Sequence, residues 1–359
     1  MPANQNTRLE RLFLLGRLLS PFYSCLMANR SRFYRNGFFR QHKLDAPVIS
    51  VGNLVLGGTG KTPLVIHIAR LLSRHGRKPV ILSRGYKGTA KANINIVSDA
   101  KEILLDAIKA GDEPRLLAEK LPGIPVLTGR KRTVTGRYAI TFLAADALIL
   151  DDGFQHLALK RDLDIVLFSG HKLLGNGHVL PGGELREPLS SLKRADIFVL
   201  TGVESPNDAR AADFSKYLQD SFPGKPVFTG AYHPENLVHS LHRGKYTTLH
   251  LSEVRQMAVF GFCGIAQPQS FAKTLRLSGT NLTGFHGFQD HHSYSLDSIN
   301  FIYHQARQAK AQALITTEKD FVKLQNLYNE DLPLLVLPVR IKMTPDFDDY
   351  LLNRLKISP

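Results

Sequence analysis

The stretch Val48–Pro63, VISVGNLVLGGTGKTP, decides the fold. It opens with an apolar run typical of a buried strand, and its glycine-rich end leads into a helical pattern. In such a loop, glycines let backbone N–H groups converge on phosphate oxygens, and the helix start adds the positive end of its dipole. Lys61 would reach the β- and γ-phosphates, and the hydroxyl of Thr62 would bind Mg²⁺. The residues predicted to bind a nucleoside triphosphate are Gly57, Gly58, Thr59, Gly60, Lys61 and Thr62.

The two residues before these glycines, Val55 and Leu56, help to identify the class of phosphate loop. The standard pattern has glycine or alanine five residues before Gly60, where this chain has Val55. Partitioning ATPases, which are dimeric switches, carry an additional lysine in the sequence GKGGTGKT, and the corresponding positions here are Val55 and Leu56. The missing lysine counts against an ATPase switch that binds DNA or membrane, but that switch remains the alternative function.

A pair of acids supplies the second element of a nucleotide site. Asp151 and Asp152 follow the apolar run 147–150, which predicts a buried strand that ends in two carboxylates and a turn. After a phosphate loop, one of these carboxylates can hold Mg²⁺ beside Thr62, directly or through water. Which of the two does so stays open. The predicted metal site is Thr62, Asp151 and Asp152.

Short apolar runs alternate with helical patterns from residue 47 onward, which is typical of a parallel α/β sheet. A first series of strands is predicted at Val48–Gly52, Pro79–Leu82, Pro125–Leu127, Ala147–Asp151, Asp164–Phe168 and Ile197–Thr201. A second series is predicted at Val227–Thr229, Met257–Phe262, Leu314–Thr317 and Leu334–Pro338. We therefore predict an α/β fold, with a P-loop NTPase-like, doubly wound parallel sheet and a second, smaller α/β domain. The expected divisions are 1–43 for a basic, apolar N-terminal helical segment, 44–205 for the nucleotide-binding domain and 206–359 for the C-terminal domain.

Bulk composition limits the partners and the cofactors. The chain has 359 residues, 43% of them hydrophobic, and a formal net charge of +15. A surface this basic attracts nucleic acid, anionic membrane or a phosphorylated substrate. Cys25 and Cys263 lie far apart without a partnering motif, so neither a disulfide framework nor a zinc site is expected.

The N-terminal segment combines apolar with basic residues. Arg17 and Pro21 interrupt the apolar run 9–27, so this run is too short to span a membrane and makes a poor signal peptide. Up to residue 43, Glu10 is the one acid among eight basic residues: Arg8, Arg11, Arg17, Arg30, Arg32, Arg35, Arg40 and Lys43. This composition favours a helix lying in an anionic membrane interface. Aromatic residues among the arginines suit that interface better than nucleic acid, and no nucleic-acid partner is expected.

The motifs of the chain, taken together, resemble those of the tetraacyldisaccharide 4'-kinases, the lipid A 4'-kinases of Gram-negative bacteria. In chain order they are VGNLVLGGTGKTP, SRGY (Ser83–Tyr86), GDEP (Gly111–Pro114), DDGFQH (Asp151–His156), LPGGELREP (Leu180–Pro188), DHHSY (Asp290–Tyr294) and TTEKD (Thr316–Asp320). The resemblance implies two α/β/α domains with the nucleotide between them. It implies transfer of the ATP γ-phosphate to the 4'-hydroxyl of an acylated glucosamine disaccharide 1-phosphate, giving lipid IVA. It also implies Mg²⁺ as a cofactor and a place on the cytoplasmic face of the inner membrane, and we expect a monomer.

The same resemblance assigns roles to individual residues. Asp112 looks like the base that accepts the sugar hydroxyl proton, and His291 looks like the partner that orients it, with His292 left as the alternative. Lys61 is the third residue assigned to catalysis. Because His291 falls in the second domain, domain closure is expected to assemble the site. The residues implied beside the nucleotide are Gln155 and His156, and those implied beside the substrate are Asn53, Arg132 and Arg186.

Overall fold

The computed structural model describes residues 12–357 except residues 204, 206, 243–244, 325–326 and 329–331. Strand β1 (Val48–Asn53) lies in the middle of the larger sheet, parallel to its neighbours β5 (Ala147–Asp151) and β6 (Leu163–Ser169). Every residue of these three strands is buried, which is why they read as continuous apolar runs in the sequence. The sheet has the order β15-β8-β7-β6-β1-β5-β2-β4-β3, and its other strands are β2 (Pro79–Ser83), β3 (Asn95–Ser98), β4 (Val126–Thr128), β7 (Ile197–Thr201), β8 (Val227–Pro234) and β15 (Val339–Met343).

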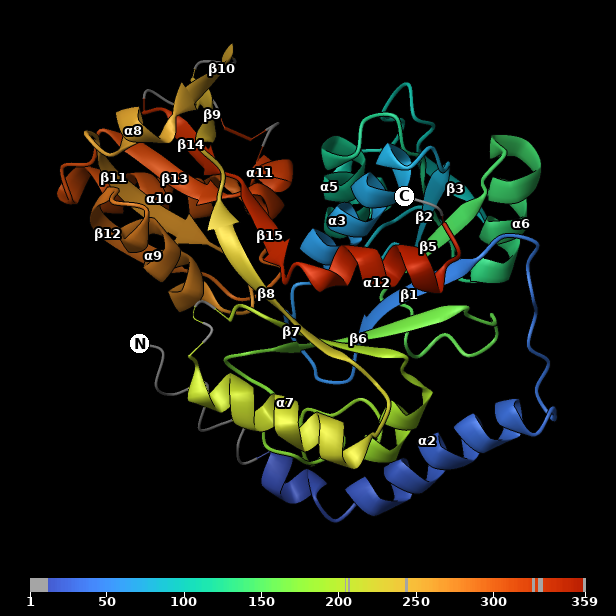
Figure 1. Ribbon diagram of the computed structural model, residues 1–359. Coiled ribbons are helices and arrows are strands. Elements are labelled where there is room, and N and C mark those ends of the chain that lie inside the picture. Colours follow the sequence, from blue (N-terminus) through green and yellow to red (C-terminus); the bar gives the residue numbers. More distant parts are fainter. Residues whose placement is uncertain are drawn as a thin grey trace.

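Helices cover both faces of this sheet, as expected for a doubly wound fold (Figure 1). One face carries α3 (Lys61–Arg74), α5 (Asp112–Lys120) with the short α4 (Ala107–Ala110) before it, and α12 (Asp346–Arg354). The other face carries α6 (Arg132–Leu143), the 3-10 helix η1 (Leu189–Arg194) and α7 (Ala209–Ser221).

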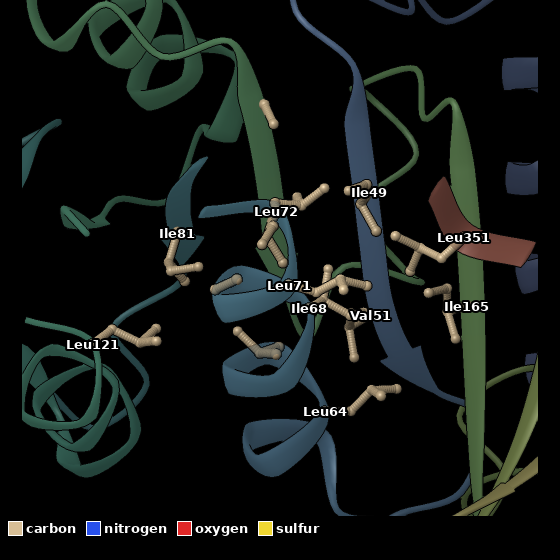
Figure 2. Packing of buried hydrophobic residues seen from close by; sticks show 14 of the residues in the cluster. Ile49, Val51, Leu64, Ile68, Leu71, Leu72, Ile81, Leu121, Ile165 and Leu351 are labelled. Carbon is tan, nitrogen blue, oxygen red and sulfur yellow. The ribbon is translucent and has the colours of Figure 1, made fainter. Parts of the chain in front are cut away.

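Helix α3 forms because its apolar residues recur at helical spacing and face the sheet. Leu64, Ile68 and Leu72 are fully buried and form one stripe of the helix. Figure 2 shows this stripe against Ile49 and Val51, the residues of β1 that point to the same face. The packing fixes the start of α3 relative to the end of β1, and the phosphate loop joins these two points.

The smaller sheet is likewise covered on both faces. Its strand order is β10-β9-β14-β13-β11-β12, with bounds β9 (Leu237–His242), β10 (Lys245–His250), β11 (Ala258–Cys263), β12 (Asn281–Gly287), β13 (Ala313–Thr317) and β14 (Leu334–Leu337). The helices around it are α8 (Leu251–Val254), α9 (Pro268–Leu277), α10 (Leu296–Gln308) and α11 (Glu318–Leu324). Helices α8 and α9 contribute to one apolar core, and α10 and α11 contribute to the other.

The two sheets do not divide the chain at residue 206. Strand β8, expected as the first strand of the second series, pairs in parallel with β7 in the larger sheet. Strand β15 returns from the second domain and pairs antiparallel with β8. The connections therefore run side by side, and the N–H of Glu235 donates to the carbonyl of Pro338 over 2.8 Å. The residues of a short apolar strand do not indicate which sheet it joins, so the sequence analysis assigned β8 to the wrong series of strands.

Helix α2 (Ser20–Arg35) packs along the larger domain (Figure 1). It contacts η1 there. Its first residue is buried, and the Ser20 hydroxyl donates to the carbonyl of Val179 (2.7 Å) and accepts from the N–H of Gly182 (2.9 Å). Among the residues described, no helix is long and apolar enough to cross a membrane.

The packing of α3 predicts a clear difference between two leucines. Leu72 is fully buried and Leu26 of α2 is 61% exposed. Leu72→Ala should lower the free energy of unfolding by about 2–5 kcal/mol, because it leaves a cavity in the core. Leu26→Ala should change it by no more than about 0.5 kcal/mol. Urea unfolding in membrane-free buffer measures both, and equal losses would contradict this packing.

Candidate active site

A cavity of about 1120 Å³ lies where the carboxyl ends of strands from both sheets meet. Its walls come from the phosphate loop after β1, the acidic turn after β5, the start of α5, and the loops after β11 and β13. Ligands of open α/β sheets bind at the carboxyl ends of the strands. The phosphate loop and the acids at 151 and 152, which the sequence analysis singled out, line this cavity.

The phosphate loop has the backbone that its glycines allow. Gly57 and Gly60 have φ angles of 104° and 75°, which side chains rarely adopt. A Cβ atom on Gly60 would lie 1.8 Å from the phenolic oxygen of Tyr232, a residue of β8. Helix α3 begins at the next residue, Lys61, so its first N–H groups face the loop. Thr62 also lines the cavity.

Lys61 contacts two polar side chains that a bound phosphate could replace as its partners. Its ammonium is 3.3 Å from Asn53 Oδ1 and 3.5 Å from Asp152 Oδ1. Asn53 also donates to the carbonyl of Val55 (2.6 Å) and is fully buried, so it supports the loop from below and does not line the cavity. Asn53 was predicted to contact the substrate, but its side-chain amide instead donates to the backbone of the phosphate loop.

Asp152, Arg186 and Gln155 form a second charged group beside this lysine. One guanidinium nitrogen of Arg186 lies 3.0 and 2.9 Å from the two carboxylate oxygens of Asp152 and 3.3 Å from Gln155 Oε1. Burial alone would raise the pKa of Asp152, but Lys61 and Arg186 outweigh it and lower that pKa below its usual value. Asp152 is therefore an ionised bridge between the phosphate loop and the LPGGELREP loop.

Asp151 is in a different state although it is the next residue. Burial first, then the charges of Glu113 and Asp152, raise its pKa to about 7. Its Oδ2 accepts from the Ser83 hydroxyl (3.0 Å), whereas its Oδ1 is buried and has no partner among the described residues. An unpartnered carboxylate oxygen next to a phosphate loop suits a hard cation whose other ligands are phosphate, hydroxyl and water oxygens. The residues present therefore fit Mg²⁺.

A cationic wall faces these acids. Arg132 is 4% exposed, and burial lowers the pKa of its guanidinium to about 10, with Asp151 acting against the shift. Burial, followed by the charge of Arg132, lowers the pKa of His156 to about 4, so its imidazole is neutral near pH 7. Both side chains line the cavity, as do Arg84 and Arg130. This wall suits the phosphate groups of a substrate or nucleotide.

The predicted pair of Asp112 and His291 is assembled across the two domains. Asp112 is the first residue of α5, and its Oδ2 lies 3.3 Å from His291 Nδ1. Burial raises the pKa of Asp112, but the His291 hydrogen bond and the charge of Lys323 outweigh it and lower that pKa below its usual value. His292 instead lies 3.0 Å from the Ser298 hydroxyl and stacks on Phe288, so the structure places His291 at the site.

Three residues of α2 line the cavity although no motif marked them. Tyr23, Met27 and Arg30 recur at helical spacing on the inner face of α2. Arg30 donates to the carbonyl of Gln155 (3.0 Å), and the Tyr23 hydroxyl donates to the carbonyl of Arg186 (3.3 Å). The spacing was visible in the sequence, but nothing local indicates that this face of the helix meets the nucleotide loops.

Comparison with known proteins identifies the family. The model of the tetraacyldisaccharide-1-P 4'-kinase family matches residues 12–356. The chain belongs to this family. It is 45% identical to a tetraacyldisaccharide 4'-kinase from Desulfotalea psychrophila, with 95% of this chain and 96% of that protein covered. It is 42% identical to one from Syntrophus aciditrophicus, with 96% and 93% covered.

A solved structure of the family agrees with the fold. A crystal structure of LpxK from Aquifex aeolicus in complex with ATP has a TM-score of 0.73 and 32% identity, covering 94% of this chain and 97% of that one. The chain is thus a kinase of the tetraacyldisaccharide 4'-kinase family.

The buried, neutral His156 makes the stability of this kinase depend on pH. The unfolded chain takes up a proton at His156 below pH about 6.5, whereas the folded chain does so only near its pKa of about 4. Stability is therefore lost as the pH falls through this window. In nucleotide-free and metal-free buffer, we compare how much the free energy of unfolding falls between pH 7.5 and pH 5. The fall should be about 1–2 kcal/mol smaller for His156→Gln than for the wild type. Urea unfolding at the two pH values measures both changes. Equal losses of stability in the wild type and in His156→Gln would show that His156 is solvated.

Proposed function

We propose that this chain transfers the γ-phosphate of ATP to the 4'-hydroxyl of a tetraacyldisaccharide 1-phosphate. One observation carries the proposal: a single cavity brings together Lys61 of the phosphate loop, the unpartnered oxygen of Asp151 and the Asp112–His291 pair. A nucleotide switch needs the first two features but has no use for a base held by a histidine. The 4'-kinase relatives supply the identity of the acceptor.

Asp112 is the proposed base. The contacts of His291 and Lys323 are both to Asp112 Oδ2, so Oδ1 is the oxygen that would accept the proton of the 4'-hydroxyl. As the hydroxyl oxygen forms its bond to the γ-phosphorus, the bond from phosphorus to the β,γ-bridging oxygen breaks, ADP leaves, and the proton passes to Asp112. A lowered pKa makes Asp112 a weak base, which suits a proton that transfers late. Positioning and charge neutralisation then supply most of the rate enhancement.

Mg²⁺ is the proposed cofactor, held by Asp151 and the Thr62 hydroxyl. When bound, it would neutralise charge on the β- and γ-phosphates. Lys61 would leave Asp152 and Asn53 to meet the same phosphates, and Asp152 would keep its pair with Arg186. Arg132, with its neighbours Arg84 and Arg130, would bind phosphate groups of the substrate, and Gln155 and His156 would lie beside the nucleotide.

The proposed site of action is the cytoplasmic surface of the inner membrane, with α2 as the contact and the chain acting as a monomer. The helix separates the cavity from an exposed apolar surface, since Leu18, Phe22 and Leu26 are 82%, 76% and 61% exposed. On its other flank, α2 and η1 enclose a groove of about 490 Å³ whose charged lining is entirely basic: Arg32, Arg35, Arg161, Lys193 and Arg194. Apolar residues flanked by cations suit an anionic membrane interface, where an acylated substrate is available.

The transfer reaction is tested with purified protein, γ-labelled ATP, Mg²⁺ and the tetraacyl disaccharide 1-phosphate. Label should appear on the lipid with the wild type. Asp112→Asn should lower kcat by about 10²- to 10⁴-fold, because the hydroxyl proton loses its acceptor, while ATP binding persists. Lys61→Ala should also weaken ATP binding. ATP hydrolysis stimulated by DNA, with no labelled lipid, would overturn the proposal in favour of a switch.

Membrane contact is tested with vesicles that contain phosphatidylglycerol. The double substitution Phe22→Ser and Leu26→Ser should weaken co-sedimentation by at least about 10-fold, because two apolar side chains leave the interface. The matched control is Phe142→Ser with Leu277→Ser, two residues that are each 70% exposed but lie on α6 and α9. This control should bind as the wild type does. Equal losses in both doubles would exclude α2 as the specific contact.

A further inference from the structure

Both ring nitrogens of His291 have a partner, and the partners differ in chemistry. Nδ1 lies 3.3 Å from the carboxylate of Asp112, and Nε2 lies 3.1 Å from the ammonium of Lys319. The ring is also held through its backbone, because the N–H of His291 donates to the carbonyl of Gly264 over 3.0 Å. Its orientation toward the two partners is therefore fixed from three sides.

The two partners together determine which nitrogen of His291 carries the proton. A lysine side chain is an ammonium ion at neutral pH, with three donors and no acceptor. An ammonium can hydrogen-bond to Nε2 only if that nitrogen offers its lone pair. The single proton of a neutral imidazole must then sit on Nδ1, where it points at Asp112. The ionised carboxylate of Asp112 accepts only, so it requires the same arrangement. Without Lys319, Nε2 would be free to take up a second proton.

Lys319 is itself held in place by two carboxylates. It is in the first turn of α11 and lies 3.3 Å from Asp290 Oδ1 and 3.7 Å from Glu113 Oε1. Its side chain is only 19% exposed. Glu113 belongs to α5 in the larger domain, whereas Asp290 precedes His291 in the smaller one. The ammonium thus links the element that carries the base to the loop that carries its partner.

We infer that Lys319 is a positioning residue, which holds His291 neutral with its proton on Nδ1, so that Asp112 accepts a hydrogen bond from an uncharged ring. This inference rests on the proposed role of Asp112 as the base. A neutral donor orients the carboxylate and leaves it able to take the hydroxyl proton. An imidazolium would bind Asp112 more strongly and weaken it as a base.

Loss of the ammonium should therefore make the activity depend on pH. The charged groups that face the ring or its backbone come from α5, α11, the loop before the ring and the loop after β2: Asp112, Glu113, Lys319, Lys323, Asp290 and Lys87. In Lys319→Met the ring keeps its carboxylate neighbours but loses its nearest cation. With that cation gone, a second proton on the ring is less disfavoured, so the ring protonates more readily as the pH falls.

The first test compares the dependence of kcat on pH in three variants. Lys319→Met should have a kcat reduced by about 10-fold or more near pH 6.5, recovering toward the wild-type value by pH 9 as the ring loses its second proton. Lys319→Arg, which keeps a cationic donor, should follow the wild-type profile. The control is Lys310→Met, an exposed lysine of the same domain that does not line the cavity. A reduction by Lys319→Met that is the same at every pH would indicate a merely structural role and overturn the inference.

The second test reads the tautomer directly and does not depend on turnover. Nitrogen-15 spectra of histidine-labelled protein, assigned with His291→Gln, should show a neutral ring protonated on Nδ1 in the wild type. The Lys319→Met spectrum should show a doubly protonated ring near pH 6.5. A wild-type ring protonated on Nε2 would overturn the inference. If the Asp112→Asn variant kept full activity while the tautomer was as stated, the proposed base would fail and the placement of the proton would stand.

Discussion

Parallel pairing between β1 and β5 is the constraint on which the site depends. Val51 and Asp151 are register partners, so the phosphate loop and the acidic turn leave the sheet at the same edge. The turn then crosses the end of β1 so closely that a Cβ atom on Gly52 would lie 2.6 Å from Phe154. Only glycine permits this approach. This approach lets Asp152 form an ion pair with Lys61. It also buries Asp151, whose pKa is raised whereas that of the neighbouring Asp152 is lowered.

The same edge connects the nucleotide site to α2 through a short series of contacts. The LPGGELREP loop pairs with the approach to the phosphate loop, since Leu56 N–H donates to the Glu184 carbonyl and Arg186 N–H to the Leu54 carbonyl, both over 2.8 Å. This pairing lets Arg186 reach Asp152. Helix α2 rests on the same loop through Ser20 and Tyr23. A helix with an exposed apolar outer face therefore shares its supports with the phosphate-binding residues.

Local patterns in the sequence predicted the parts of the site that lie close together in the chain. The phosphate loop and the acids at 151 and 152 each follow one buried strand, so apolar runs and turn residues suffice to find them. The pairing of Asp112 with His291 came only from the resemblance to a family, because 179 residues separate them. Contacts that depend on the packing of distant elements were missed, namely the place of β8 in the larger sheet, the inner face of α2 and the lysine behind His291. Neither periodicity nor spacing contains this information.

Several ion pairs join the two domains at the site. Lys120 pairs with Glu318, Lys319 with Glu113, and His291 with Asp112, all between α5 and residues of the smaller domain. The side chains of these pairs are largely buried, and the cost of removing their charges from water offsets much of their mutual attraction. Because both partners regain water when a pair separates, the net cost of opening such a contact is small. Its geometry is nevertheless demanding, because each pair forms only when α5 and α11 are in register. An interface that is weak but specific suits a kinase in which closure over the substrates would bring His291 to the proposed base, Asp112. The adjacent strands β8 and β15 provide the connection about which such a movement can occur.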